Sequence, residues 1–151
     1  MNNRIFDIAS KTDIPFINET YNQNIDKLHG THRTFNDWDE LLTDKKSTYY
    51  IVRTTEPVAW FRTEIIDNIL WLSMLQVKSE FQHQGFGKCV LSFIENLAKS
   101  NNINQLGIHT TEDNIAARNL YQSFGYTVSE IGKCTTADGV ERIGYTFIKN
   151  I

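Results

Sequence analysis

The hydrophobic positions in the first part of the chain recur at helical spacing. In TDIPFINETYNQNIDKLHG (12–30), apolar side chains stand three or four residues apart, as on one face of a helix: Ile14, Ile17, Tyr21, Ile25 and Leu28. Pro15 suits a first helical turn, and Gly30 follows the last apolar position. The segment NDWDELL (36–42) shows a shorter pattern of the same period. Two helices are therefore predicted before the first strand.

Three segments with the length and composition of strands follow. They are TYYIVRT (48–54), VAWFRTEII (58–66) and ILWLSMLQV (69–77). Only a few residues separate them, among them Asp67-Asn68 between the second and the third. Links this short join antiparallel neighbours, so the three segments are predicted to form consecutive hairpins.

The second half alternates between helical and extended patterns. The elements predicted there are a helix from Gly85 to near Asn101, a strand at 104–110, a helix at 114–124 and two strands at 126–133 and 140–149. Gly125 suits the left-handed position after a helix, and Asp138-Gly139 is a strong hairpin signal. The predicted order is α-α-β-β-β-α-β-α-β-β.

Length, charge and cysteine content narrow the class of protein. The chain has 151 residues without repeats or linkers, so residues 1–151 are predicted to form one α+β domain. The formal net charge of −3 and the absence of a basic run exclude a non-specific nucleic-acid binder. No signal peptide or membrane span is predicted, which favours a cytoplasmic location without a membrane partner. Cys89 and Cys134 lack metal-site spacing, so no metal is predicted.

The segment FQHQGFGKCV (81–90) carries the first candidate for chemistry. It follows a predicted strand and opens a helix at Gly85, so unpaired backbone N–H groups and the positive end of the helix dipole meet there. Gly85 and Gly87 let an anion approach the backbone closely, and Lys88 adds a positive charge. The alternative interpretation is that the two glycines only permit tight packing of helix against strand.

Two common phosphate-binding motifs fit this segment poorly. A Walker A loop requires a glycine five residues before Gly87, where Gln82 stands. A dinucleotide fingerprint requires a small residue at position 90, where Val90 stands, and it opens a parallel βαβ unit. The hairpins predicted before the loop differ from that arrangement.

Two motifs resemble the signatures of one superfamily. Gln82, Gly85 and Gly87 match the pattern Gln/Arg-x-x-Gly-x-Gly/Ala, with glutamine where arginine is commoner. In NIAARNLYQSFGY, the pattern Asn-x-x-Ala-x-x-Leu-Tyr-x-x-x-Gly-Phe/Tyr is matched at Asn114, Ala117, Leu120, Tyr121, Gly125 and Tyr126. With this element order, the chain resembles the GNAT superfamily of N-acetyltransferases over nearly its whole length. The resemblance implies a three-layer α+β fold, with a mixed, mostly antiparallel central sheet flanked by helices.

The resemblance also implies acetyl-CoA as the co-substrate. The backbone of Leu75, Gln76 and Val77 would then hold the pantetheine arm at a splay between strands, and Asn114 would touch the cofactor from the next helix. The pyrophosphate would lie in the cradle formed by Gln82, His83, Gln84, Gly85, Phe86, Gly87 and Lys88.

Members of the superfamily typically react by direct attack of an amine on the thioester in a ternary complex. By the resemblance, Tyr121 is the general acid that protonates the departing thiolate. His109 is a candidate base that titrates near neutrality, although it can equally be an ordinary strand histidine. Glu64, acting through water, is the second candidate. Weaker candidates are Ser73 and Glu80, and Cys89 is interpreted as a helix-packing residue.

The acceptor is predicted to be a primary amine of a small molecule or peptide. In the superfamily its site is shaped by the final strand pair and by the link between the first helices, here HGTHRT (29–34). His29, His32 and Arg33 can meet a carboxylate there, or they form a solvated loop. A homodimer through the last strands is plausible by family analogy. The alternative function is a non-catalytic acyl-CoA-binding or sensor module with the same fold.

Overall fold

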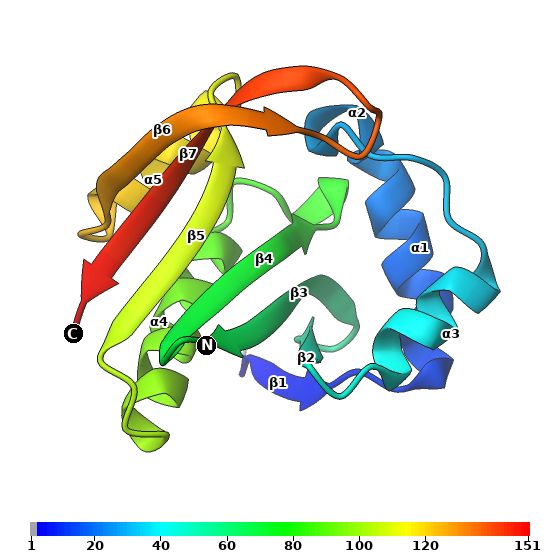
Figure 1. The fold of residues 1–151 in the computed structure, drawn as a ribbon. Coiled ribbons are helices and arrows are strands. Elements are labelled where there is room, and N and C mark those ends of the chain that lie inside the picture. Colours follow the sequence, from blue (N-terminus) through cyan, green and yellow to red (C-terminus); the bar gives the residue numbers. More distant parts are fainter. Residues whose placement is uncertain (1–2) are drawn as a thin grey trace.

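A computed structural model describes residues 3–151 and shows a seven-stranded sheet with helices on both faces (Figure 1). The strand order is β1-β2-β3-β4-β5-β7-β6. The strands are β1 (Ile5–Ile8), β2 (Ser47–Arg53), β3 (Pro57–Ile66), β4 (Ile69–Val77), β5 (Gln105–Thr111), β6 (Thr127–Thr135) and β7 (Glu141–Asn150). The α-helices are α1 (Ile14–Gln23), α2 (Ile25–Leu28), α3 (Phe35–Thr43), α4 (Phe86–Ser100) and α5 (Ile115–Ser123), and 3₁₀ turns occur at Lys11–Asp13 and Ser79–Phe81.

The predicted fold class is confirmed. All neighbouring strands pair antiparallel except β4 and β5, which are parallel, so the sheet is mixed and mostly antiparallel. The hairpin between β3 and β4 turns through Asp67 and Asn68, both with positive φ (50° and 62°), as a type I′ turn requires. Gly125 ends α5 with a φ of 90°, as predicted.

The predicted element order omitted one strand. β1 pairs antiparallel with β2 at the edge of the sheet, from Ile5 opposite Arg53 to Ile8 opposite Tyr50. It has only four residues, and Ile5 and Ile8 are 50% and 70% exposed. A short, exposed edge strand carries too little apolar alternation to stand out in a sequence.

The first predicted helix is also divided in two. Asn24, with φ −110° and ψ 8°, separates α1 from α2. Its side-chain amide donates to Gln76 Oε1 at 2.9 Å and to the Val77 carbonyl at 3.3 Å on β4. The hydrogen bonds of Asn24 therefore hold α1 and α2 against the sheet. The helical spacing of apolar residues cannot predict such a tertiary contact.

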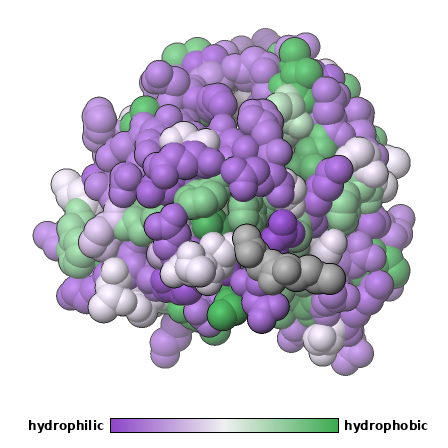
Figure 2. Space-filling view, turned by 180° about the vertical axis from the view of Figure 1, so that it is seen from behind, coloured by the Kyte–Doolittle hydropathy of each residue, from purple (hydrophilic) through white to green (hydrophobic). Residues whose placement is uncertain are grey.

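Two hydrophobic clusters hold the layers together. The larger lies between the sheet and α4 and α5, and includes Phe61, Leu91 and Phe147. The smaller packs α1 and α3 on the opposite face, around Trp38 and Trp60. On the surface seen from behind in Figure 2, polar side chains dominate and hydrophobic residues form small separate patches. Within residues 3–151, no helix is both long and apolar enough to span a membrane.

The sheet opens between its two parallel strands. β4 and β5 are paired only from Leu70 opposite Leu106 to Leu72 opposite Ile108, although both strands continue beyond this point. The register between β3 and β4 shifts nearby, and Met74 has a φ of 55°. The backbone of β4 beyond Leu72 therefore has no partner from β5, close to the irregular part of its ladder with β3.

Candidate active site

Two cavities meet where β4 and β5 separate. The first, of about 550 Å³, lies against the glycine loop 81–88 and is called the loop cavity. The second, of about 460 Å³, lies against the hairpin of β6 and β7 and is called the hairpin cavity. Both cavities are lined by Lys27, Leu28, Leu75, Gln76, Asn114 and Tyr121. These shared residues mark the junction of the cavities.

The glycine loop gives α4 an exposed amino end. Gly85 precedes the helix with a φ of 83°, a conformation that favours glycine. The N–H groups of the first turn have no acceptor within the helix. A Cβ on Gly87 would lie 2.9 Å from Leu120 Cδ2, so this glycine lets α4 pack closely against α5 without displacing the Leu120 side chain. The two glycines thus have different roles.

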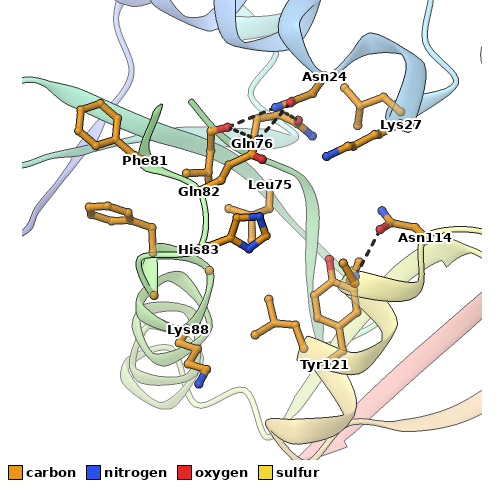
Figure 3. Close-up of a pocket in the computed structure, with 18 residues that line it drawn as sticks. Asn24, Lys27, Leu75, Gln76, Phe81, Gln82, His83, Lys88, Asn114 and Tyr121 are labelled. Atoms are coloured by element: carbon orange, nitrogen blue, oxygen red, sulfur yellow. Dashed lines mark hydrogen bonds between the residues drawn. The ribbon is translucent and has the colours of Figure 1, made fainter. Parts of the chain in front are cut away.

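Hydrogen bonds hold this loop against β4 (Figure 3). Gln82 donates from Nε2 to the Val77 carbonyl at 3.1 Å and to Asn24 Oδ1 at 3.3 Å. Asn24 in turn donates to Gln76 Oε1, and both residues are buried. The Gln82 side chain therefore anchors the loop to β4, whose backbone is predicted to hold the cofactor, and to Asn24 between α1 and α2.

Helix α5 supplies Asn114 and Tyr121. Asn114 caps the helix, with its Oδ1 accepting a hydrogen bond from the Ala117 N–H at 3.3 Å. Tyr121 lies seven residues further along, so it projects from about the same helical face (Figure 3). Burial raises the pKa of Tyr121 to about 12. The phenol consequently stays protonated at neutral pH and can donate a proton at the junction.

His109, on β5, lines the hairpin cavity together with Tyr121. Its ring stacks on Trp71 with centroids 4.5 Å apart, and Nδ1 lies 3.0 Å from Thr146 Oγ1. Burial lowers the pKa of His109, and the nearby Glu130 carboxylate opposes this effect. The imidazole is therefore mostly neutral near pH 7 and can accept a proton.

The other candidates for catalysis lie elsewhere. Glu64 pairs with Arg62 at 3.2 Å and lines neither of the two cavities. Arg62 also donates to Ser73 Oγ at 3.4 Å. Glu80 is exposed and pairs with Lys78 at 3.5 Å, while Cys89 contacts Arg4. Among the candidate bases, only His109 shares a cavity with Tyr121 in the part of the chain that the structure describes.

Most of the residues that were predicted to bind the cofactor gather around one cavity. Those that line the loop cavity are Leu75, Gln76, Val77, Gln82, His83, Gly85, Phe86, Gly87, Lys88 and Asn114. Gln84 is the exception: its side chain donates to the Glu80 carbonyl at 3.2 Å and does not line the cavity. No motif marked Lys27 or Leu28 as a site residue, and both reach the junction because the chain breaks at Asn24. No cluster of potential metal ligands occurs within residues 3–151.

Comparisons with known proteins agree with this geometry. A sequence model described as the Acetyltransferase (GNAT) family matches residues 13–126. A sequence comparison with curated proteins finds no match.

Solved structures with the same fold cover nearly the whole chain at low sequence identity. A ribosomal-protein-alanine N-acetyltransferase from Brucella melitensis has a TM-score of 0.81 at 16% identity, covering 97% of this chain and 99% of that one. The spermidine N-acetyltransferase SpeG from Vibrio cholerae, as a mutant, has a TM-score of 0.81 at 14% identity, with coverage of 97% and 93%. The yncA protein from Salmonella typhimurium, a putative acetyltransferase solved with acetyl-CoA, has a TM-score of 0.77 at 16% identity, with coverage of 99% and 94%.

Proposed function

Because this chain belongs to the acetyltransferase (GNAT) family and is thus an acyltransferase, we propose that it moves an acetyl group from acetyl-CoA to a primary amine. The acceptor is a small molecule or a peptide, and the amine attacks the thioester directly in a ternary complex. The observation that carries the proposal is that Tyr121, a buried and protonated phenol, lines both cavities at their junction.

Acetyl-CoA occupies the loop cavity in this proposal. The pyrophosphate lies against residues 82–88, where the first-turn N–H groups of α4 offer hydrogen bonds and Lys88 offers a positive charge. The pantetheine arm follows the backbone of Leu75 to Val77, which β5 leaves unpaired. This path leads the thioester to the junction beside Tyr121.

The acceptor amine enters from the hairpin cavity, where His109 removes its proton. When His109 Nδ1–H donates to Thr146 Oγ1, Nε2 carries the lone pair that accepts this proton. The neutral amine nitrogen then forms a bond to the thioester carbonyl carbon, and the carbon–sulfur bond breaks. Tyr121 gives its phenolic proton to the departing thiolate, and the proton that the nitrogen loses as the amide forms returns to the Tyr121 phenolate. Glu64, which pairs with Arg62 and lines neither cavity, remains the second candidate base and would reach the amine only through a chain of waters.

A non-catalytic acyl-CoA-binding module is the alternative, and the loop cavity fits both functions. The hairpin cavity, with His109 facing the same space as Tyr121, favours the enzyme because a binder needs neither a base nor an acid there. The two functions are separated by measuring free thiol release from acetyl-CoA over a panel of amines. An enzyme releases thiol only with its acceptors, and Tyr121→Phe reduces that release. A binding module binds acetyl-CoA without release on any amine.

Location and assembly also follow from the proposal. We place the protein in the cytoplasm, where acetyl-CoA is available, acting without nucleic acid, membrane or metal. A homodimer through the last strands is proposed on the ground that β6 is an edge strand whose residues are mostly exposed.

A further inference from the structure

Three side-chain amides meet at β4, close to the junction of the two cavities. Asn24 donates from Nδ2 to Gln76 Oε1 at 2.9 Å and to the Val77 carbonyl at 3.3 Å. Gln82 donates from Nε2 to the same carbonyl at 3.1 Å and to Asn24 Oδ1 at 3.3 Å. Dashed lines in Figure 3 mark this network, which lies across the loop cavity from Tyr121.

One backbone carbonyl fixes the orientation of all three amides. A carbonyl oxygen only accepts hydrogen bonds, so the atoms of Asn24 and Gln82 that face the Val77 carbonyl are their amide nitrogens. The same Asn24 nitrogen also faces Gln76, which must therefore present its oxygen to Asn24. The Nε2 group of Gln76 is consequently left outside the network, and it donates to no atom within residues 3–151.

The location of Gln76 directs this unused donor at the reaction site. The residue is only 5% exposed, and it lines both cavities at their junction. Its Nε2 atom is not enclosed by protein, so it faces the space of the cavities. The backbone of Gln76 lies in the part of β4 that β5 leaves unpaired. A buried donor that is held in one orientation indicates an acceptor atom that the chain does not supply.

Gln76 differs from the other donors at the junction. Among the residues that line both cavities, the other side-chain donors are Lys27, Asn114 and Tyr121. Tyr121 has a single proton, which the proposed reaction gives to sulfur. Lys27 is exposed and Asn114 is half-buried, so both are more accessible to water than Gln76. A hydrogen bond is electrostatically stronger in the interior than in water, which favours Gln76 as the group that stabilises developing charge.

We propose that Gln76 is a catalytic residue whose Nε2 group donates a hydrogen bond to the carbonyl oxygen of the acetyl thioester. The inference rests on the proposed function. When the amine nitrogen bonds to the carbonyl carbon, the π electrons of the carbonyl move to its oxygen, which becomes an oxyanion. They form the carbonyl again as the carbon–sulfur bond breaks, and Gln76 keeps its protons throughout. Because Asn24 already holds the amide in place, the donor needs no reorganisation during this step.

The carbonyl stretch of bound acetyl-CoA tests this hydrogen bond without any turnover. Acetyl-CoA that carries a heavy carbon isotope at the carbonyl is bound to the protein in the absence of an amine. Isotope-difference infrared spectroscopy then isolates the band of that carbonyl. A hydrogen bond to the oxygen weakens the carbon–oxygen bond, so the band is expected at a lower wavenumber than that of a simple acetyl thioester in an aprotic solvent.

Matched variants assign the shift to one side chain. Gln76→Glu keeps an oxygen that accepts from Asn24 and removes the donor, so it should return the band to a higher wavenumber. Gln76→Met, which adds no charge, should do the same. Asn114→Asp keeps the oxygen that accepts from the Ala117 N–H and removes the other amide donor, so the shift should stay in place. Circular dichroism checks that all three variants are folded.

Kinetics separate a catalytic role of Gln76 from a structural one. In Gln76→Met, kcat is expected to fall about 10²–10³-fold, as for the loss of one donor to an oxyanion. The Kd for coenzyme A, which has no thioester carbonyl, should stay close to that of the wild-type protein. A loss of coenzyme A affinity as large as the fall in kcat would make the role structural and overturn the inference.

The spectroscopic outcomes also separate this inference from the proposed function. A wild-type band at the aprotic position overturns the inference, as does a shift that persists in both Gln76 variants. A shift that is lost in both Gln76 variants and kept in Asn114→Asp supports it. The same result without thiol release on any amine supports the hydrogen bond and contradicts the proposed acetyl transfer.

Discussion

The imidazole of His109 stacks on the indole of Trp71, with centroids 4.5 Å apart and 10° between the planes. Trp71 lies opposite Gly107 in the short parallel ladder of β4 and β5, and a Cβ on Gly107 would come within 2.5 Å of the Trp71 ring. The glycine thus makes space for the indole, and the indole supports the imidazole. This arrangement orients the candidate base at the point where the two strands separate.

Gly107→Ala is expected to disturb this support. Its methyl group would displace the Trp71 ring, and overpacking of this kind typically costs about 1–3 kcal/mol. Chemical denaturation should therefore show a lower free energy of unfolding, and kcat should fall as well because His109 loses its stacking partner. Gly132→Ala is the control for stability alone, because a Cβ there meets no atom within 4 Å but Gly132 lines the hairpin cavity. If Gly107→Ala matched the wild-type protein in stability and kcat, the stack would not be needed.

The acidic limb of the pH–rate profile should reflect the protonation of His109. Since burial lowers the pKa of His109, the neutral base persists below its ordinary pKa of about 6.5, and kcat/KM should fall only at lower pH. His109→Gln should flatten this limb and lower the rate by about 10²–10⁴-fold. A His109→Gln enzyme with a normal rate and an unchanged limb would eliminate the histidine as base, and Glu64→Gln would be measured next.

Glu130 gives a second way to examine the same limb. Its carboxylate favours the protonated imidazole and so raises the pKa that burial lowers. Glu130→Gln should therefore move the acidic limb of kcat/KM to still lower pH, with the neutral base retained. A shift to higher pH would contradict the electrostatic coupling between these two residues.

Gln82 should matter for cofactor affinity through the position of its loop. Gln82→Ala removes the hydrogen bonds to the Val77 carbonyl and Asn24 Oδ1, each typically worth about 1 kcal/mol, so the loop 81–88 loses its anchor. The Kd for acetyl-CoA is expected to rise about tenfold in calorimetry, on the same reasoning. Gln122→Ala, on the exposed side of α5, is the control. An unchanged Kd for Gln82→Ala would show that the loop holds its shape without this side chain.

The parts of the fold that sequence reasoning recovered are those with strong local signals. The long amphipathic helix α4 and the strands of the β2–β3–β4 hairpins have clear periods, and the Asp67-Asn68 turn needs the positive φ values that these residue types tolerate. The glycine loop and the motif at Asn114 and Tyr121 predicted residues that do gather around one cavity. Their roles in binding and catalysis stay predictions.

The features that escaped prediction depend on contacts between distant segments. The break at Asn24 arises from hydrogen bonds to Gln76 and Val77, more than fifty residues away in sequence, and it brings Lys27 to the junction. Arg33 lies over the rings of Tyr21 and Trp38, and this contact likewise requires the two rings to meet in the folded protein. No periodicity within one segment contains this information.

The central claim is tested most directly by acetyl transfer itself. Wild-type protein and Tyr121→Phe are incubated with acetyl-CoA and the amine panel, free thiol is followed over time, and the acetylated acceptor is quantified by mass spectrometry. We expect thiol and acetylated amine to appear in equal amounts with the wild-type protein. Tyr121→Phe should bind acetyl-CoA with a similar Kd and turn over about 10²–10⁴-fold more slowly. Tight binding of acetyl-CoA without thiol release on any amine, with no difference between the two proteins, would contradict the assignment as an acetyltransferase whose acid is Tyr121.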